Sequence, residues 1–231
     1  MRVVIPGGNG KTGRAVVGAL RARDVTAVPL GRGDVPGVAD AAYLIAPNMH
    51  PDEPALVAGL LDALRAAGVS RVVYHSVASP YAPDMPHHLG KARAEDLVRR
   101  SGLSWTILQP GPYLQNLDLT APVRVPYDVH AVFGFADLRE VAEAAATVLT
   151  EPGHEGATYE LASRTATVAG LAAEAGATAE RVPGPSGLGP WFDAMFAYYD
   201  RHGLPVGTRT LAALLGRGAA AGPSDTRPTP P

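Results

Sequence analysis

A short apolar strand that leads into glycines spaced three apart constrains this chain more than any other feature. Residues 3–6 are apolar, and Gly7, Gly10 and Gly13 follow, ahead of a helix-forming stretch. Gly7 permits a sharp turn, Gly10 leaves room for a pyrophosphate beside the backbone, and Gly13 lets the helix lie close to the strand. A tight turn needs one or two glycines for structural reasons alone. Their place near the N-terminus, where an open α/β fold has its first strand, favours a dinucleotide-binding turn. Its predicted residues are Gly7, Gly8, Asn9, Gly10, Lys11, Thr12 and Gly13.

The composition excludes several kinds of protein. The 231 residues contain no cysteine, which excludes disulfides, thiolate catalysis and cysteine-held metals. A formal net charge of −2 argues against a nucleic-acid partner. No apolar run approaches the ~20 residues of a membrane span, and no basic-then-apolar leader precedes the first strand. We therefore expect a cytoplasmic protein with no membrane contact.

Strand and helix patterns alternate along the chain, which predicts an α/β fold with a doubly wound parallel Rossmann sheet. The predicted strands are 2–6, 26–30, 42–46, 71–76, 104–109 and 158–161, and the predicted helices are 12–23, 52–67, 88–100, 138–149, 168–175, 191–202 and 208–215. Asp137 is placed to cap the helix 138–149. We expect residues 1–150 to form the nucleotide domain and residues 151–217 a small, mainly helical substrate region that returns one strand to the sheet. The tail 218–231 is predicted to be disordered.

The connection after the second predicted strand is unusually short. Only about eleven residues separate Leu30 from the next strand, whereas a helical crossover takes a dozen or more. One strand-helix unit is therefore predicted to be missing here. The second strand would then lie at the edge of the sheet, and the adenine pocket would lose one wall.

Several later segments resemble the NmrA-like group of atypical short-chain dehydrogenase/reductases. They are residues 71–77, 85–95, 105–116, 137–142, 156–161 and 198–204. The resemblance extends to about Arg217 and implies a Rossmann fold that binds NADP(H) or NAD(H), with reductase activity or redox-linked regulation. The chain departs from the family after Leu30, where the lost strand usually ends in an acidic residue near the adenine. The segment 117–128 is also shorter than the corresponding segment of the family usually is.

The resemblance implies a functional pair on the helix 88–100 and just before it. The wider superfamily places a Tyr four residues before a Lys that holds the nicotinamide ribose, and here His87 and Lys91 occupy those positions. Lys91 is expected to contact the ribose, and His87 is a candidate proton donor. In the alternative interpretation, His87 and His88 cap the helix and Lys91 pairs with Glu95 on a solvated face. Two adjacent histidines without a third ligand do not indicate a metal site.

Arg32 ends the second predicted strand, where an NADP enzyme carries a basic residue for the 2′-phosphate. It favours NADP(H) over NAD(H), although Asp34 lies close enough to oppose this. Lys11 is a possible second cation over the phosphates. Arg32 can also be an exposed loop charge without function.

Other candidates follow the predicted strands. Ser76 stands where the superfamily has its catalytic Ser, but serine is also ordinary in a turn. Ala46 and Pro47 should pass under the cofactor. The resemblance implies that Pro110 faces the nicotinamide, although it can equally belong to a turn, and Tyr113 and Asn116 are candidate substrate contacts. The aromatic residues near the C-terminus, of which one or two could line an apolar pocket, are Trp191, Phe192, Phe196, Tyr198 and Tyr199.

Together these features predict an NADP(H)-binding oxidoreductase that reduces a small apolar carbonyl or quinone-like substrate by hydride transfer. One alternative is a non-catalytic NADP(H) redox sensor that signals through a regulatory partner. Another is a cofactor-free isomerase, cyclase or lyase, which the shortened connection motivates. A homodimer is compatible with each of these.

Overall fold

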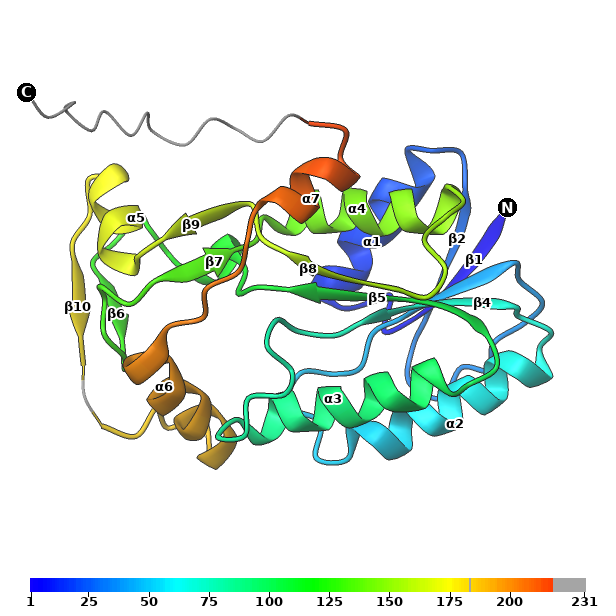
Figure 1. Cartoon of the computed structure of the whole chain (residues 1–231), viewed down its shortest axis with the longest axis horizontal. Helices are drawn as coiled ribbons and strands as arrows, with labels where there is room; N and C mark the ends of the chain where they lie inside the picture. The colour runs from blue at the N-terminus through cyan, green and yellow to red at the C-terminus, as the bar shows by residue number, and fades with distance from the viewer. Residues whose placement is uncertain (183, 218–231) are drawn as a thin grey trace, which may run out of the picture.

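Six parallel strands form the central sheet of the molecule (Figure 1). The computed structural model describes residues 1–182 and 184–217. The strands lie in the order β2-β1-β3-β4-β5-β8, and each neighbouring pair is parallel. Their bounds are β1 Arg2–Pro6, β2 Thr26–Leu30, β3 Ala41–Leu44, β4 Arg71–His75, β5 Ser104–Pro110 and β8 Ala157–Leu161. The predicted parallel sheet is confirmed.

Helices cover both faces of this sheet. α1 (Lys11–Arg21) and α4 (Leu138–Thr150) pack together on one face, and α7 (Arg209–Leu214) packs on α4 and β8. α2 (Glu53–Ala66) and α3 (Pro86–Arg99) pack together on the other face. The inner strands β1, β3, β4 and β5 are largely buried on both sides, as a doubly wound sheet requires, whereas the edge strands β2 and β8 are partly exposed. No helix within residues 1–182 and 184–217 is long and apolar enough to span a bilayer.

The connection from β2 to β3 confirms the shortening expected from the sequence. Residues 31–40 contain no helix or strand and lead from the edge strand β2, past β1, to β3. One strand-helix unit of the usual doubly wound pattern is therefore missing beyond β2.

On α2, Leu61 and Leu64 lie in the core, whereas Leu56 and Leu60 are half-buried.

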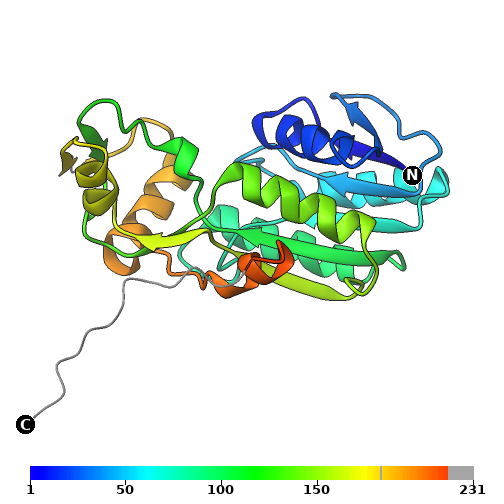
Figure 2. The ribbon, with the colours of Figure 1, turned by 90° about the horizontal axis from the view of Figure 1, so that it is seen from above.

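A smaller lobe lies beyond the carboxyl ends of the strands (Figure 2). It combines two two-stranded sheets, β6 with β10 and β7 with β9, with two helices and a short 3-10 turn. The bounds are η1 Leu114–Asn116, β6 Val123–Val125, β7 Phe133–Phe135, β9 Arg164–Ala166, α5 Val168–Glu174, β10 Ala179–Arg181 and α6 Pro190–His202. The helices were predicted but the four strands were not, because three residues are too few to show an alternating pattern.

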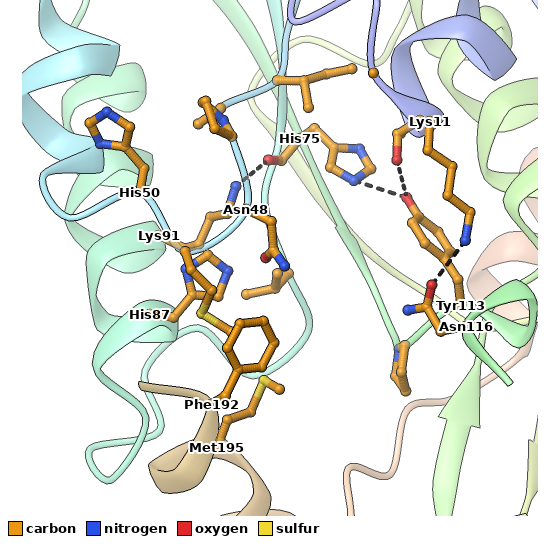
Figure 3. Close-up of a pocket in the computed structure, with 18 of the residues that line it drawn as sticks. Lys11, Asn48, His50, His75, His87, Lys91, Tyr113, Asn116, Phe192 and Met195 are labelled. Carbon is orange, nitrogen blue, oxygen red and sulfur yellow. Dashed lines mark hydrogen bonds between the residues drawn. The ribbon is translucent and has the colours of Figure 1, made fainter. Parts of the chain in front are cut away.

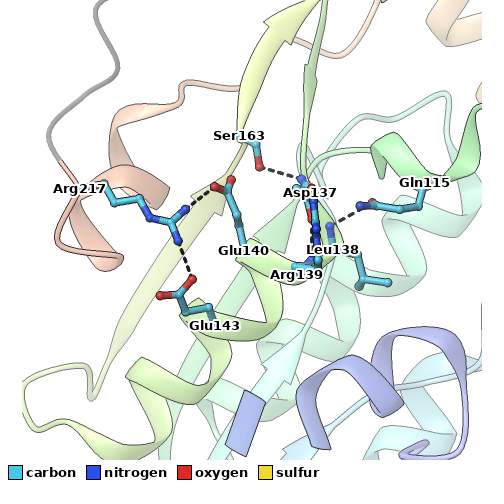
Figure 4. A network of polar contacts seen from close by, with 8 residues as sticks. All are labelled: Gln115, Asp137, Leu138, Arg139, Glu140, Glu143, Ser163 and Arg217. Carbon is cyan, nitrogen blue, oxygen red and sulfur yellow. Dashed lines mark hydrogen bonds and ion pairs between the residues drawn. The ribbon is translucent and has the colours of Figure 1, made fainter. Parts of the chain in front are cut away.

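Polar contacts hold the first two turns of α4 (Figure 4). The Asp137 side chain accepts a hydrogen bond from the Arg139 N–H at 2.8 Å, which confirms the predicted N-cap. Arg217, after α7, pairs with Glu140 and, at 2.8 Å, with Glu143. The last described turn of chain is thus held on the outer side of α4. The tail 218–231, predicted to be disordered, lies outside the described residues.

Candidate cofactor and active site

A large cavity lies where the parallel strands end. Its volume is about 1710 Å³, and it reaches from the loop after β1 across the ends of β3, β4 and β5 to α6. Open α/β sheets bind their ligands at this edge. Three residues predicted at strand ends, Ala46, Pro47 and Pro110, line the cavity.

The glycine loop forms one end of the cavity, and its glycines serve different purposes. Gly7 has a φ of +82°, and a Cβ there would lie 2.4 Å from the Ile45 carbonyl oxygen. A Cβ on Gly13 would lie 2.4 Å from the Gly7 oxygen, so the close approach of α1 requires glycine. A Cβ on Gly10 would meet only the Gly7 oxygen, at 3.4 Å, so the space beside Gly10 is open and fits a pyrophosphate.

Gly8 is the one predicted loop residue that does not line this cavity. Its α-carbon is buried, and a Cβ there would lie 2.7 Å from Pro29 of β2. Gly8 therefore serves packing between the loop and β2. The remaining loop residues line the cavity: Gly7, Asn9, Gly10, Lys11, Thr12 and Gly13.

The first turn of α1 is left available for an anion. This helix has neither a side-chain cap nor an acidic residue in its first turn. By contrast, Asp52 caps α2 and Asp137 caps α4 through side-chain oxygens. The free N–H groups and the positive end of the helix dipole favour a phosphate at this point.

Lys11 and Asn116, which we expected to bind the cofactor and the substrate respectively, contact each other (Figure 3). The Lys11 ammonium donates to Asn116 Oδ1 at 2.9 Å and to the Gln115 carbonyl oxygen at 3.1 Å. Tyr113, also predicted to face substrate, lies beside the same loop, with its hydroxyl 3.5 Å from Thr12 Oγ1. The segment that follows β5 is therefore attached to the glycine loop. One of the three Lys11 N–H groups stays available for a phosphate.

Arg32 stands at the cavity rim just beyond β2. Its side chain is exposed, lines the cavity and makes no ion pair or hydrogen bond with the described residues. Asp34 uses one carboxylate oxygen to accept a hydrogen bond from the Gly31 N–H at 2.7 Å. The arginine is thus available to an anion, whereas the neighbouring carboxylate is partly engaged by its own turn.

Lys91 lies on the floor of the cavity and is only 4% exposed. Its ammonium pairs with Glu53 Oε1 at 2.7 Å and donates to the His75 carbonyl oxygen at 3.1 Å. The alternative interpretation, a solvated Lys91–Glu95 pair, is wrong, because Lys91 is buried and its partner belongs to α2. Burial lowers the pKa of Lys91, and the Glu53 carboxylate opposes that change.

Ser76 lines the cavity, but its hydroxyl points to a buried acid. It donates to Glu95 Oε1 at 2.5 Å, and the Gln109 amide donates to the same oxygen at 2.7 Å. Arg99 pairs with the other carboxylate oxygen of Glu95 at 2.9 Å. Because a hydroxyl has one hydrogen, Ser76 can donate to a substrate carbonyl only after leaving Glu95.

His87 lies one helical turn before Lys91 and faces the same cavity. It is 4% exposed, its Nδ1 is buried, and neither ring nitrogen has a hydrogen-bond partner among the described residues. Burial lowers the pKa of His87 to about 3, with the positive charge of Lys91 as a further cause. The ring is therefore neutral near pH 7. Neither His87 nor His88 caps α3, because Met85 stands at the N-cap without a side-chain bond.

His75, at the end of β4, joins two tyrosines in a chain of contacts that the sequence did not reveal. Its Nδ1 lies 2.6 Å from the Tyr43 hydroxyl, and its Nε2 lies 3.0 Å from the Tyr113 hydroxyl. Burial lowers the pKa of His75 to about 3, so one ring nitrogen donates and the other accepts. The chain Tyr43–His75–Tyr113 connects the centre of the sheet to the glycine loop.

The far end of the cavity is apolar and aromatic. Phe192, Met195, Phe196 and Tyr199 of α6 line it together with Tyr127, whose ring centroid lies 5.7 Å from that of Phe196. In Figure 3, His87 lies between Lys91 and Phe192. Of the five aromatic residues predicted near the C-terminus, Trp191 and Tyr198 are not part of this lining.

The sequence pattern of the NAD(P)H-binding family matches residues 33–152, just over half of the chain. The chain belongs to the NAD(P)H-binding family. The matched segment begins after the glycine loop, so the loop is an independent indication of the same cofactor.

Three curated relatives of this NAD(P)H-binding protein are reductases or oxidoreductases. It is 32% identical over 145 residues to the NAD(P)H azoreductase of Xenophilus azovorans. The aligned residues make up 59% of this chain and 49% of the azoreductase. The chain thus aligns with about half the length of the curated relatives it matches. Two solved structures share its fold. The NADPH-dependent quinone oxidoreductase of Escherichia coli, complexed with NADPH, has a TM-score of 0.75 and 22% identity over 93% of this chain and 95% of that one. NmrA, a negative transcriptional regulator in complex with NADP, has a TM-score of 0.73 and 16% identity over 93% of this chain and 91% of that one.

Two buried polar residues at this cavity were missed from sequence: Glu53, which pairs with Lys91, and His75, which lines the cavity. Glu53 follows Asp52, which the structure places at the N-cap of α2, and it resembled an ordinary acidic residue in a first helical turn. His75 precedes Ser76 at a strand end, which was the available signal for a cavity residue. Among the described residues, no three His, Cys, Asp or Glu side chains gather as metal ligands would.

Proposed function

We propose that this protein is an NADPH-dependent reductase of planar, apolar acceptors such as quinones. The observation that carries the proposal is the continuity of one cavity from the glycine loop, past Lys91, to the aromatic residues of α6. A dinucleotide on the loop and an apolar acceptor on α6 would meet at Lys91 and His87. The azoreductase and quinone oxidoreductase relatives support the same class of reaction.

Each part of the cavity would have a distinct role toward these ligands. Gly10 and the first turn of α1 would hold the pyrophosphate, and Arg32 the 2′-phosphate that distinguishes NADPH from NADH. Lys91 has two of its three N–H groups engaged, and the third would hold the nicotinamide ribose. Bound NADPH would supply a hydride from its nicotinamide.

His87 would bind the acceptor through a hydrogen bond. Because its pKa is lowered to about 3, the imidazolium form is scarce at neutral pH. We therefore favour a neutral imidazole N–H that donates to the acceptor oxygen over release of a proton from His87. The apolar residues of α6 that line the same cavity, Phe192 and Phe196 among them, would exclude water and favour a flat ring.

Titration of nicotinamide fluorescence with NADPH, followed by NADPH oxidation with a naphthoquinone, tests this function. Saturable binding and turnover are expected, with little turnover of a small hydrophilic aldehyde. Binding without turnover of any acceptor would instead support the redox-sensor alternative, in which a regulatory partner or a second copy reads the bound state. No binding at millimolar dinucleotide would support the cofactor-free alternative.

A further inference from the structure

A buried acid stands directly behind Lys91 and outside the cavity lining. Glu53 begins α2 and is 1% exposed. Its Oε1 accepts a hydrogen bond from the Tyr74 hydroxyl at 2.6 Å and pairs with the Lys91 ammonium at 2.7 Å. Its Oε2 is buried and has no partner among the described residues.

A carboxylate in this position is costly, since burial of a charge is offset only by close pairing. Glu95 cannot replace it, because Ser76, Gln109 and Arg99 already occupy both oxygens of Glu95. Glu53 is therefore the acid that compensates the buried Lys91 charge. Its Oε1 and the His75 carbonyl oxygen fix two of the three ammonium N–H groups, which leaves one for the cavity.

We propose that Glu53 is the positioning residue that holds the Lys91 ammonium charged and directed at the cavity, so that Lys91 can bind the ribose of NADPH. This inference rests on the proposed role of Lys91 in the reductase. The competing explanation is purely structural, namely an ion pair that joins α2 to α3.

The charges around Lys91 indicate how the two explanations differ. Burial is the main cause that lowers the pKa of Lys91, and Glu53 is the main influence that raises it. The titratable groups that face the ammonium are Glu53 of α2, Tyr74 and His75 of β4, and His87, His88 and Glu95 of α3. Without the Glu53 charge, Lys91 should lose its proton at a lower pH, and NADPH binding should weaken as the pH rises.

The sequence provides a direct way to observe this. Lysine occurs only at positions 11 and 91, so ¹³Cε-labelled lysine gives two NMR signals, and the exposed Lys11 is an internal control. In the apo protein, Glu53→Gln should move the titration of Lys91 to lower pH and leave Lys11 unchanged. Lys91→Met assigns the signals.

The same variant gives a binding readout. Between about pH 6.5 and about pH 9, the NADPH affinity of Glu53→Gln should fall roughly tenfold more than that of the wild type, as for a lost hydrogen bond to a charged group. Tyr74→Phe is the matched control, because it removes the other donor to Oε1 and keeps the carboxylate. Its Lys91 titration should follow the wild type.

Two results would overturn the proposal. One is a Lys91 signal that titrates alike in the wild type and Glu53→Gln. The other is a further loss of NADPH affinity when Glu53→Gln is added to Lys91→Met, because Glu53 should act only through Lys91. If Glu53→Gln does not fold, Glu53→Asp keeps the charge and should retain the wild-type titration, and a downward shift there would count against the proposal. If the wild type binds no NADPH, the proposed reductase function and the ribose role of Lys91 are both refuted. The NMR titration then still decides whether Glu53 keeps the Lys91 ammonium charged.

Discussion

The two ends of the cavity are built by different means. The glycine-loop end is made by backbone groups of β1 and α1, and its open space depends on the missing Cβ of Gly10. The α6 end is made by side chains, with Tyr127, Phe192 and Phe196 as its walls. A substitution that adds atoms should therefore weaken binding at the glycine-loop end, whereas one that removes atoms should weaken binding at the α6 end.

This difference also matches the chemistry proposed for each end. Phosphates are bound by fixed N–H groups of a helix terminus, which requires an exact backbone path. An apolar ring is bound by contact area, to which several side chains contribute roughly in proportion. We expect sharp effects of substitution at the loop and graded effects at α6.

The largest effects should come from valine at two glycines of the same loop. Gly13→Val places atoms against the Gly7 backbone and should cost roughly 3 kcal/mol of unfolding free energy or more. Gly10→Val faces open space, so it should leave the unfolding free energy nearly unchanged but weaken NADPH binding by at least about tenfold, since the side chain occupies the phosphate position. Urea unfolding and fluorescence titration measure the two quantities.

Gly33→Val is an imperfect control for Gly13→Val and Gly10→Val, because the φ of +86° at Gly33 strains any side chain there. Gly18→Ala is better, because it lies in the same helix α1 with nothing within 4 Å of a Cβ. It should leave the NADPH affinity unchanged and raise the unfolding free energy by about 0.5–1 kcal/mol, because alanine is the better helix former. Full NADPH affinity in a folded Gly10→Val protein would remove the phosphate site from the loop.

Arg32→Ala should have the next largest effect. The arginine is exposed at the end of β2 and unpaired among the described residues, so its guanidinium is available for the 2′-phosphate. Its loss should cost roughly 1–3 kcal/mol of NADPH affinity, as for a charged hydrogen bond, and barely alter NADH affinity. Isothermal titration with both cofactors measures the difference. An equal loss for NADPH and NADH would assign Arg32 another purpose.

At the opposite end, Phe196→Ala should act on the acceptor and not on the cofactor. Loss of about 50 Å² of apolar contact at about 25 cal/mol per Å² corresponds to roughly 1.3 kcal/mol, or a ninefold increase in KM for a quinone. NADPH affinity should stay the same. Tyr198→Ala, on the same helix but outside the lining, is the matched control. A change in NADPH affinity for Phe196→Ala would show that the two ends are coupled.

The same contrast explains what could be predicted from the sequence. The strand before Gly7, the glycine spacing and the short connection after Leu30 are local features, and each was found where it was predicted. The Glu53–Lys91 pair depends on α2 and α3 lying side by side, and the His75 contacts depend on Tyr43 of β3 and on Tyr113 in the segment after β5. Single-sequence patterns carry periodicity but not such pairings.

Other misses have a similar physical origin. Lys11 and Asn116 were assigned to different ligands because nothing local indicates that η1 returns to the glycine loop. The strands of the small lobe, such as Phe133–Phe135, are too short to alternate visibly and are fixed by tertiary packing.

The smallest effect should come from the adenine end of the cavity, where the missing strand-helix unit leaves little apolar surface. Leu60 of α2 is half-buried and lines the cavity with Leu56, and we expect both side chains to contact the adenine. Leu60→Ala should remove about 30 Å² of contact, worth roughly 0.8 kcal/mol or a three- to fourfold loss of NADPH affinity. With one wall absent, wild-type NADPH affinity should itself be micromolar or weaker, about −8 kcal/mol or less favourable. Val35→Ser, at an 80% exposed position of the loop 31–40, is the control and should change nothing. Nanomolar binding by the monomer, or a hundredfold loss in Leu60→Ala, would show that the adenine is enclosed after all and that this end resembles α6 more than the glycine loop.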